Sequence, residues 1–178
     1  MKIYIARHGQ TEWNKLNKIC GLTDVDLTAL GREQAGKLAE DLKDKNLSVI
    51  ISSPLKRAMD TAGYVSGETG VPVMIDERLI EQNYGKFEGT DRRGAGFLEN
   101  KRNFAYRYPN GESMMQVAHR TYGLLDEIKE KYAGNDVLLV CHGGVARVMR
   151  TYFLDMTNDE FFNYSMENAS YEVFETGY

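Results

Sequence analysis

Short apolar segments alternate with longer amphipathic segments from one end of this chain to the other. Short runs of β-branched and other apolar residues, bounded by polar or glycine-containing turns, are typical of buried strands. Apolar residues that recur every three or four positions are typical of helices that cover a sheet. This alternation predicts an α/β fold of three layers, with a mainly parallel central sheet and helices on both of its faces.

The turn residues between these segments set the bounds of the expected strands and helices. Strands are expected at residues 2–6, 47–51, 73–75, 136–141 and 171–174. Helices are expected at residues 28–44, from Pro54 to about Ser66, 113–132 and 145–154. Thr28 is placed to cap the first helix and Ser53 the second, because hydroxyl side chains satisfy the free N–H groups of a first turn. The segment from 90 to 111 is expected to be irregular.

Charge and cysteine content argue against several classes of protein. The 178 residues fit one domain, and 22 Lys and Arg against 26 Asp and Glu give a formal charge of −4. A mildly acidic chain is a poor general binder of nucleic acid, so any affinity for an anion must come from a local basic cluster. No apolar run approaches the ~20 residues of a membrane helix. Cys20 and Cys141 form no CxxC pair, which argues against a disulfide scaffold or zinc ribbon and favours a reduced, cytoplasmic setting.

Basic side chains and histidines follow three of the expected strands. Arg7 and His8 end the first, Arg57 comes shortly after the second, and His142 follows the strand at 136–141. Parallel strands bring their carboxyl ends to one edge of a sheet, where ligands bind. Arginine forks fit phosphate oxygens, a neutral imidazole is a nucleophile towards phosphorus, and a carboxylic acid can protonate a leaving oxygen. The set predicts phosphoryl transfer without a metal.

Five motifs occur in order over nearly the whole chain. They are Arg7-His8-Gly9-Gln10-Thr11-Glu12-Trp13-Asn14, Leu27-Thr28 with Gly31-Arg32, Ser52-Ser53-Pro54-Leu55-Lys56-Arg57-Ala58, Leu79-Ile80-Glu81 with Gly85 and Glu88-Gly89, and His142-Gly143-Gly144. Together they resemble the signatures of the histidine phosphatase superfamily, the phosphoglycerate mutase-like enzymes. The resemblance implies a phosphoglycerate mutase-like fold with a single domain over residues 1–178 and a lid or specificity insertion around 90–108.

The resemblance also implies a role for each site residue. His8 is expected to be the nucleophile that becomes phosphohistidine, and Glu81 the proton donor. The residues expected to bind the phosphate are Arg7, Arg57 and His142. Asn14 and the backbone of Gly143 are expected to assist them, and Gly21 to lie in the loop that frames the substrate. No cofactor or metal is expected; the expected partner is a small phosphorylated substrate, with no nucleic acid and no membrane.

Some assignments stay open at this point. Glu12 and Glu88 are rival carboxylates to Glu81 for the acid role. A basic rim over the site, or alternatively a solvated loop, is expected from Arg92, Arg93, Lys101, Arg102 and Arg107. Structural roles are expected for His119, Cys141 and the loop thiol of Cys20.

The function expected is that of a metal-independent phosphatase acting on small phosphomonoesters. One alternative is a phosphoglycerate mutase, which would return the phosphoryl group to its substrate. Another is a non-catalytic phospho-ligand binding protein on the same fold. A metallohydrolase receives no support, because neither His8 nor His142 sits in a ligand-like i, i+4 pair. The physiological substrate and the oligomeric state are left open.

Overall fold

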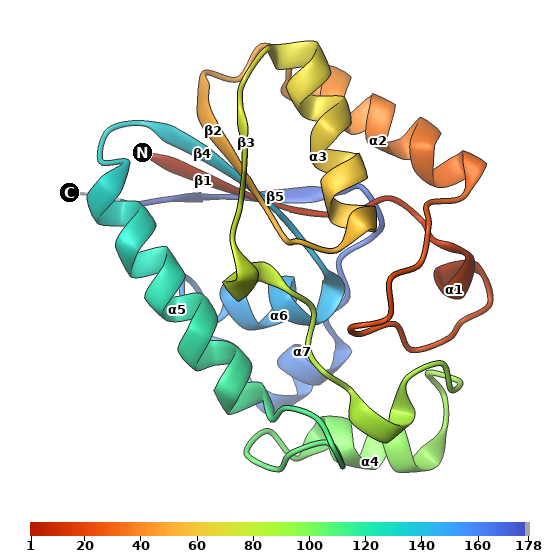
Figure 1. Ribbon diagram of the computed structural model, residues 1–178. Coiled ribbons are helices and arrows are strands. Elements are labelled where there is room, and N and C mark those ends of the chain that lie inside the picture. The colour runs from red at the N-terminus through yellow and green to blue at the C-terminus, as the bar shows by residue number, and fades with distance from the viewer. Residues whose placement is uncertain (177–178) are drawn as a thin grey trace.

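The structure is a computed structural model that describes residues 1–176. Its five strands form one sheet in the order β3-β2-β4-β1-β5 (Figure 1). They are β1 (Lys2–Arg7), β2 (Leu47–Ser52), β3 (Val73–Ile75), β4 (Asp136–Cys141) and β5 (Tyr171–Glu175). The pairs β1–β4, β2–β4 and β2–β3 are parallel, and β5 runs antiparallel to β1. The prediction of a mainly parallel α/β sheet is confirmed.

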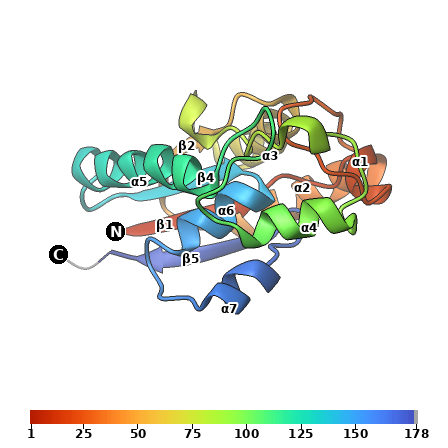
Figure 2. The ribbon, with the colours of Figure 1, turned by 90° about the horizontal axis from the view of Figure 1, so that it is seen from below.

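Helices cover both faces of this sheet, which gives the three predicted layers. α2 (Ala29–Leu42) and α3 (Lys56–Thr69) lie on one face, and α5 (Met114–Lys131) and α6 (Gly143–Arg150) lie on the other (Figures 1 and 2). The remaining elements are α1 (Glu12–Lys15), α4 (Ala95–Arg102), α7 (Asn158–Asn163) and 3-10 turns at Glu77–Leu79 and Gly85–Phe87. None of the helices in residues 1–176 has the length and apolar composition that crossing a bilayer requires.

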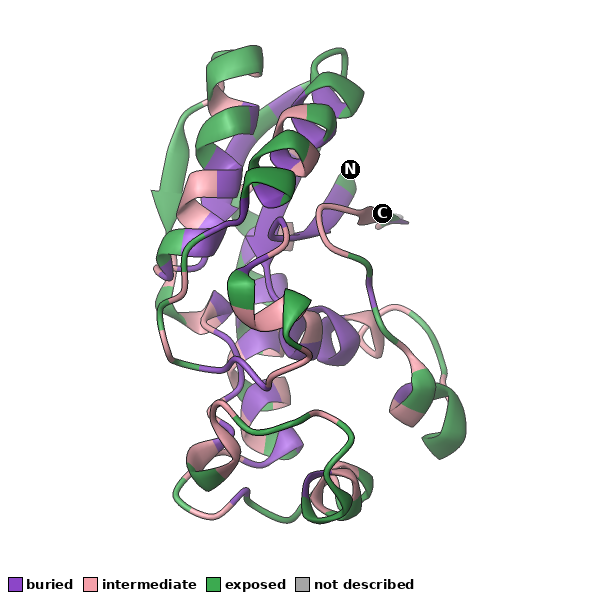
Figure 3. Ribbon diagram, turned by 90° about the vertical axis from the view of Figure 1, so that its right-hand side faces the viewer, coloured by how far each residue is buried: buried purple, intermediate pink, exposed green. Residues whose placement is uncertain are grey.

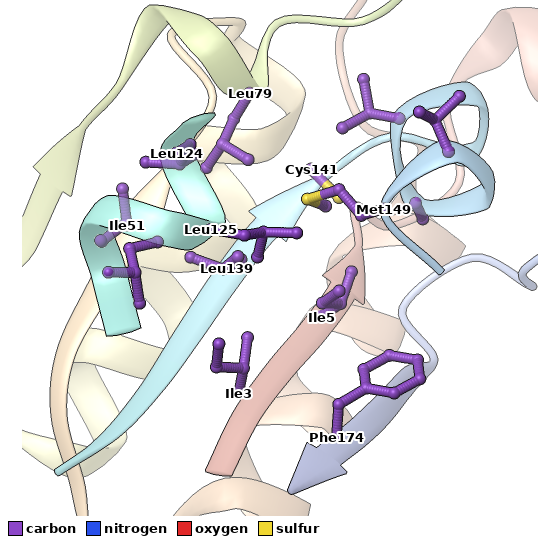
Figure 4. Packing of buried hydrophobic residues seen from close by; sticks show 14 of the residues in the cluster. Ile3, Ile5, Ile51, Leu79, Leu124, Leu125, Leu139, Cys141, Met149 and Phe174 are labelled. Atoms are coloured by element: carbon purple, nitrogen blue, oxygen red, sulfur yellow. The ribbon is translucent and has the colours of Figure 1, made fainter. Parts of the chain in front are cut away.

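Successive residues of the central strands point to opposite faces of the sheet and so belong to two separate cores. Ile3, Ile5 and Leu139 pack with Leu125 of α5 and Met149 of α6 (Figure 4). The core on the other face includes Tyr4, Ala6, Leu138 and Val140, with Leu38 and Ala62 from α2 and α3. Burial on both faces explains why β1 and β4 are continuous apolar runs. The edge strand β3, by contrast, is exposed along its length (Figure 3).

The predicted cap of α2 is confirmed, and α5 begins at Met114, one residue after the predicted start, with Ser113 as a cap that was not predicted. The Thr28 hydroxyl accepts the N–H of Gly31 at 2.9 Å, at the start of α2. Ser113 and Gln116 form a capping box at the start of α5, in which each side chain accepts the other residue's backbone N–H. Both caps satisfy N–H groups that a first helical turn leaves without partners.

The predicted cap of α3 is wrong. The helix begins at Lys56, and its N-cap residue Leu55 makes no side-chain cap hydrogen bond. The Ser53 hydroxyl instead bonds to the ring of His142 at 2.7 Å and accepts the N–H of Leu55. The helix also continues past the predicted end to Thr69, where Gly70 takes the left-handed conformation (φ 71°) that ends it. Ser53 therefore belongs to the site rather than to the helix.

Residues 90–111 were predicted to be irregular, and this prediction is wrong for part of the segment. It contains α4, whose Phe97 packs with Ile19, Tyr84 and Tyr108 in a third, smaller core. α4 contacts α7 at one end of the molecule (Figure 1). A second difference is that α6 begins at Gly143, before the predicted residue 145, and ends at Arg150. The short helices α1 and α7 were not predicted.

Candidate active site

The carboxyl ends of three parallel strands meet, as the sequence predicts. β1 ends at Arg7 and is followed by His8, while the neighbouring β4 ends at Cys141 and is followed by His142. The two imidazole rings lie 5.1 Å apart between centroids. Arg57, in the first turn of the helix that follows β2, contacts His142. Topology alone therefore places these groups side by side.

His8 has one ring nitrogen fixed and one free. Its Nδ1 lies 2.7 Å from the carbonyl oxygen of Gly9, which can only accept a hydrogen bond, so Nδ1 carries the proton. Burial lowers the pKa of His8 well below its usual range, and the charges of Arg57 and Arg7 lower it further. The ring is therefore neutral near pH 7, and its Nε2 lone pair is available to attack an electrophile.

Backbone contacts hold the turn that carries His8. The N–H of Gly9 donates to the Thr61 hydroxyl at 3.1 Å. The Asn168 side chain donates to the carbonyl of His8 at 3.0 Å, and the N–H of Ala169 donates to the same carbonyl. A Cβ on Gly9 would lie 2.3 Å from the carbonyl oxygen of Gly31. Only glycine fits this close approach of two backbones.

Arg57 is fully buried and connects His142 with the loop that contains Gly21 and Thr23. Its Nε donates to Nδ1 of His142 at 3.2 Å. Its two terminal nitrogens donate to the carbonyls of Gly21 at 2.7 Å and Thr23 at 2.8 Å. Because Nδ1 of His142 accepts, its Nε2 carries the proton and donates to Ser53. Burial, followed by the charge of Arg57, lowers the pKa of His142 well below its usual range.

Arg7 and Asn14 line the same cavity as His8. A terminal nitrogen of Arg7 donates to the carbonyl of Met166 at 2.5 Å. Burial, with the charge of Arg92 next, lowers the pKa of Arg7 to about 10, so it stays charged near pH 7. Asn14 accepts at Oδ1 from the N–H of Thr11 and from Asn168, both at 3.1 Å. Its Nδ2 group is therefore left as a donor for a ligand.

Glu81 lies against the N-terminus of α6. Its carboxylate accepts the N–H groups of Gly144 at 3.0 Å and Val145 at 3.2 Å, and also that of Gln82 at 2.7 Å. These N–H groups stabilise a negative charge at this position. A Cβ on Gly144 would lie 2.6 Å from Glu81 Oε1 and 2.5 Å from the Tyr84 hydroxyl. Because Gly144 has no side chain, the Glu81 carboxylate has room at this position.

The rival carboxylates lie elsewhere. Glu88 accepts the N–H groups of Gly21 at 2.8 Å and Thr23 at 3.1 Å, so it shapes the loop that contacts Arg57. Glu12 is exposed in the short helix α1. Neither of them lines the cavity beside His8, whereas Glu81 does.

This cavity has a volume of about 320 Å³. The predicted site residues that line it are Arg7, His8, Asn14, Glu81 and Gly143. Gly143 lines it at the start of α6, and its N–H is not among those that Glu81 accepts. Arg57, His142 and Gly21 lie behind this wall, in contact with one another through Arg57. The arrangement offers a free nucleophilic nitrogen, cationic donors and a carboxyl group around one small space.

The sequence matches the family model of the histidine phosphatase superfamily (branch 1) over residues 3–178. The chain belongs to the histidine phosphatase superfamily. It is 31% identical to phosphoserine phosphatase 1 of Hydrogenobacter thermophilus, over 97% of this chain and 85% of that protein. It is 34% identical to a probable phosphoglycerate mutase of Escherichia fergusonii, over 80% of this chain and 70% of that one. The solved structure of a mycobacterial glucosyl-3-phosphoglycerate phosphatase with VO3 superposes with a TM-score of 0.89 at 30% identity, covering 99% of this chain and 92% of that one.

The basic rim of this histidine phosphatase is split between the cavity and solvent. Arg92 and Lys101 line the cavity. Arg93 pairs with Asp91 at 3.0 Å, and Arg102 lies 3.8 Å from Asp159. The fifth member of the predicted rim, Arg107, is exposed.

Three contributors to the site were given no role from the sequence. Arg147 lines the cavity from α6, one helical turn after Gly143. Thr61 lies one turn after Arg57 on α3 and donates to its carbonyl at 2.7 Å. Asn168 comes from the segment before β5, and no pattern in the sequence connects it with His8.

The structural assignments of the remaining His and Cys side chains agree with the structure. His119 is exposed on α5, and Cys141 is buried in β4. Cys20 lines the cavity, but burial raises the pKa of its thiol to about 11, so it stays protonated near pH 7. In residues 1–176, no three His, Cys, Asp or Glu side chains converge as metal ligands would.

Proposed function

We propose that this chain is a phosphatase that hydrolyses small phosphomonoesters through a phosphohistidine on His8, without a metal ion. The observation that carries this proposal is the state of His8. Its Nδ1–H is held by the carbonyl of Gly9, its Nε2 is free, and burial keeps the ring neutral. A neutral imidazole presented beside Arg7 matches what attack on a phosphate ester requires.

In the first step, Nε2 of His8 forms a bond to phosphorus while the bond from phosphorus to the ester oxygen breaks. Glu81 enters this step protonated and gives its proton to the leaving oxygen, so an alcohol departs. The N–H groups of Gly144 and Val145 then hold the carboxylate that remains. In the second step, the Glu81 carboxylate takes a proton from water as that water attacks the phosphohistidine. Inorganic phosphate leaves, and His8 regains its free Nε2.

Positive groups around the phosphoryl group supply the charge that a metal ion supplies in other phosphoryl-transfer enzymes. Arg7, Asn14 and the N–H of Gly143 lie on the cavity wall beside His8. Arg57 lies behind the wall: three of its five N–H groups bind His142, Gly21 and Thr23, and its positive charge acts on His8 and on the phosphoryl group from there. In this proposal, His142 stays neutral: its Nδ1 holds the Arg57 guanidinium in place, and its Nε2 donates to Ser53.

A phosphoglycerate mutase would share the first step and return the phosphoryl group to a substrate instead of to water. Because the chain is 34% identical to a probable phosphoglycerate mutase, an experiment has to distinguish this alternative from hydrolysis. The two functions differ in product, because hydrolysis releases inorganic phosphate in proportion to substrate consumed. A mutase would exchange the phosphoryl group between two hydroxyls with little release of phosphate.

The decisive experiment follows ³²P from a labelled phosphomonoester onto the protein in the presence of EDTA. Wild type, quenched in alkali, is expected to give an acid-labile phosphoenzyme, and His8→Ala is expected to give none. The kcat of His8→Ala is expected to fall on the order of a thousandfold or more. His119→Ala, which removes an exposed histidine, is the matched control and is expected to behave as wild type. Full activity in His8→Ala would refute the mechanism, and activity that requires a divalent ion would refute metal independence.

A further inference from the structure

The segment just before β5 supports the turn that carries His8. The N–H of Ala169 donates to the carbonyls of Arg7 and His8, both at 3.1 Å. The carbonyl of Met166 accepts from the Arg7 side chain, and that of Ser170 accepts from the Arg7 backbone N–H at 3.1 Å. These contacts bring residues from the end of the chain against the first strand. The segment is therefore part of the structure that holds the nucleophile.

Asn168, in the middle of this segment, contacts two site residues through one amide group. Its Nδ2 donates to the carbonyl of His8 at 3.0 Å and to Oδ1 of Asn14 at 3.1 Å. An amide nitrogen carries two protons, so these two bonds use both of them. Asn168 is not among the described residues that line the cavity. It therefore acts on the site through His8 and Asn14 and does not itself touch a ligand there.

The amide of Asn14 is oriented by the groups that its oxygen accepts. Oδ1 accepts the N–H of Thr11 and the Nδ2 group of Asn168, both at 3.1 Å. A backbone N–H can only donate, and Asn168 must turn its NH2 group this way because the His8 carbonyl can only accept. Such partners determine which end of an amide is the oxygen. The Nδ2 group of Asn14 therefore stays free to donate to a ligand in the cavity that Asn14 lines.

The backbone of His8 depends less on Asn168 than Asn14 does. The His8 carbonyl also accepts the N–H of Ala169, and the N–H of the same peptide group, which belongs to Gly9, donates to Thr61 at 3.1 Å. Without the Asn168 amide, this peptide group would still be held at both ends. An acceptor in place of that amide would instead compete directly for the orientation of Asn14.

We propose that Asn168 is a positioning residue that orients the amide of Asn14 for binding a phosphoryl group. Its NH2 group holds the Asn14 oxygen on the protein side, so that the Asn14 NH2 group donates to the substrate. This inference rests on the proposed phosphatase function, in which Asn14 lies beside the phosphoryl group. It adds a residue from the end of the chain to the groups that prepare the site.

The test replaces the donor by an acceptor of the same size. In Asn168→Asp, a carboxylate lies against the Asn14 oxygen, so the Asn14 amide is expected to turn over and donate to it. The Asn14 oxygen then repels phosphoryl oxygens in the cavity. With p-nitrophenyl phosphate, kcat/KM is expected to fall about a hundredfold in Asn168→Asp and about tenfold in Asn14→Ala, which only removes the donor.

A double variant separates positioning from the effect of charge. If the introduced carboxylate acts by turning Asn14, it has nothing to turn once that side chain is gone. Asn14→Ala/Asn168→Asp is therefore expected to match Asn14→Ala within about threefold, so the second substitution restores activity. Losses that multiply in the double variant would overturn the positioning role. Asn163→Asp adds the same charge at an exposed position of α7 and, as the matched control, is expected to keep the wild-type kcat/KM.

Nuclear magnetic resonance follows the Asn14 amide directly. In wild type, inorganic phosphate is expected to shift the ¹⁵N and ¹H signals of this side-chain amide, which Asn14→Ala identifies by their loss. In Asn168→Asp, phosphate is expected to leave them unshifted, because the amide donates to the carboxylate. Equal shifts in both proteins would contradict the proposal. If Asn168→Asp does not fold, Asn168→Ala carries the comparison, with a loss of about fivefold that disappears in the Asn14→Ala background.

Failure of this role and failure of the proposed function give different results. An Asn168→Asp enzyme with the wild-type kcat/KM would overturn the positioning role and leave the phosphohistidine mechanism intact. A wild-type protein that forms no phosphoenzyme with p-nitrophenyl phosphate would overturn the proposed function itself.

Discussion

The two histidines of the site carry their protons on opposite ring nitrogens. In His8, Nδ1 donates to the carbonyl of Gly9, so Nε2 is the free nitrogen. In His142, Nδ1 accepts from Arg57, so Nε2 donates to Ser53. A hydrogen-bonding partner on one nitrogen determines the chemistry available at the other. This difference makes His8, and not His142, the imidazole with an uncommitted lone pair.

The role of the Glu81 side chain as a proton donor gives a testable prediction. In Glu81→Gln, phosphoenzyme formation from an alkyl phosphate is expected to slow by about a hundredfold or more, because the leaving alkoxide receives no proton. Formation from p-nitrophenyl phosphate is expected to slow much less, because nitrophenolate leaves unaided. Pre-steady-state labelling with both substrates isolates this step. Glu12→Gln, an exposed carboxylate, is the control. Equal losses on both substrates would show that Glu81 positions the site instead of donating a proton.

Most of the site could be predicted because its residues stand in motifs at strand ends. His8, Arg57 and His142 were expected together because they follow neighbouring parallel strands, and the structure brings them together. Glu81 was expected beside them from the resemblance, and it lines the same cavity as His8. Arg147 could not be predicted in the same way, since a single cation on a helix gives no pattern that separates a cavity wall from solvent. Asn168 was missed because its contact with His8 spans 160 residues of chain. Only the folded structure connects them.

At the scale of elements, burial explains which helices were predictable. α2 and α5 bury several residues each at helical spacing, so their apolar pattern is visible in the sequence. α4 buries one residue, Phe97, and α7 buries one, Phe161, so neither shows a period. α7 does carry a capping box between Thr157 and Glu160, a signal that could have located its start.

The attachment of α4 to α7 gives a second prediction. Phe162 holds both cations at the end of α4: its carbonyl accepts from Lys101, and its ring lies 4.5 Å from Lys101 Nζ and 3.9 Å from Arg102 Cζ. Phe162→Ala is expected to loosen α4 and to speed tryptic cleavage at residues 92–107 by several-fold, because local opening exposes the chain. Mass spectrometry of timed digests measures the rate. Leu154→Ala, an exposed apolar residue outside these contacts, is the control, and equal cleavage rates in the two variants would contradict the attachment.

For the whole molecule, the buried histidines predict how stability depends on pH. The pKa values of His8 and His142 are lowered well below 6.5 in the folded chain, mainly by burial. Below about pH 6.5 the unfolded chain binds protons that the folded chain does not, so the free energy of unfolding falls as pH falls. Each histidine can contribute up to about 1.4 kcal/mol per pH unit. This stability is fully present above about pH 6.5 and is lost progressively below it.

Urea unfolding between pH 7.5 and 5.5 measures this slope. It is expected to be shallower in His142→Gln than in wild type, because one of the two buried imidazoles is removed. His119→Gln is expected to keep the wild-type slope, since this side chain is exposed. An identical slope in all three proteins would contradict the assignment of buried neutral histidines.

The position of β1 in the sheet has a consequence for the order of events during synthesis. β1 pairs only with β4 and β5 among the described strands, and Lys2 lies 134 residues from its contact Asp136. At the usual pace of a ribosome, the apolar stretch from Ile3 to Ala6 waits on the order of ten seconds before either neighbour exists. His8 is therefore synthesised long before His142 and Gly143, which complete the site around it, and during that interval the unpaired strand β1 is exposed to aggregation.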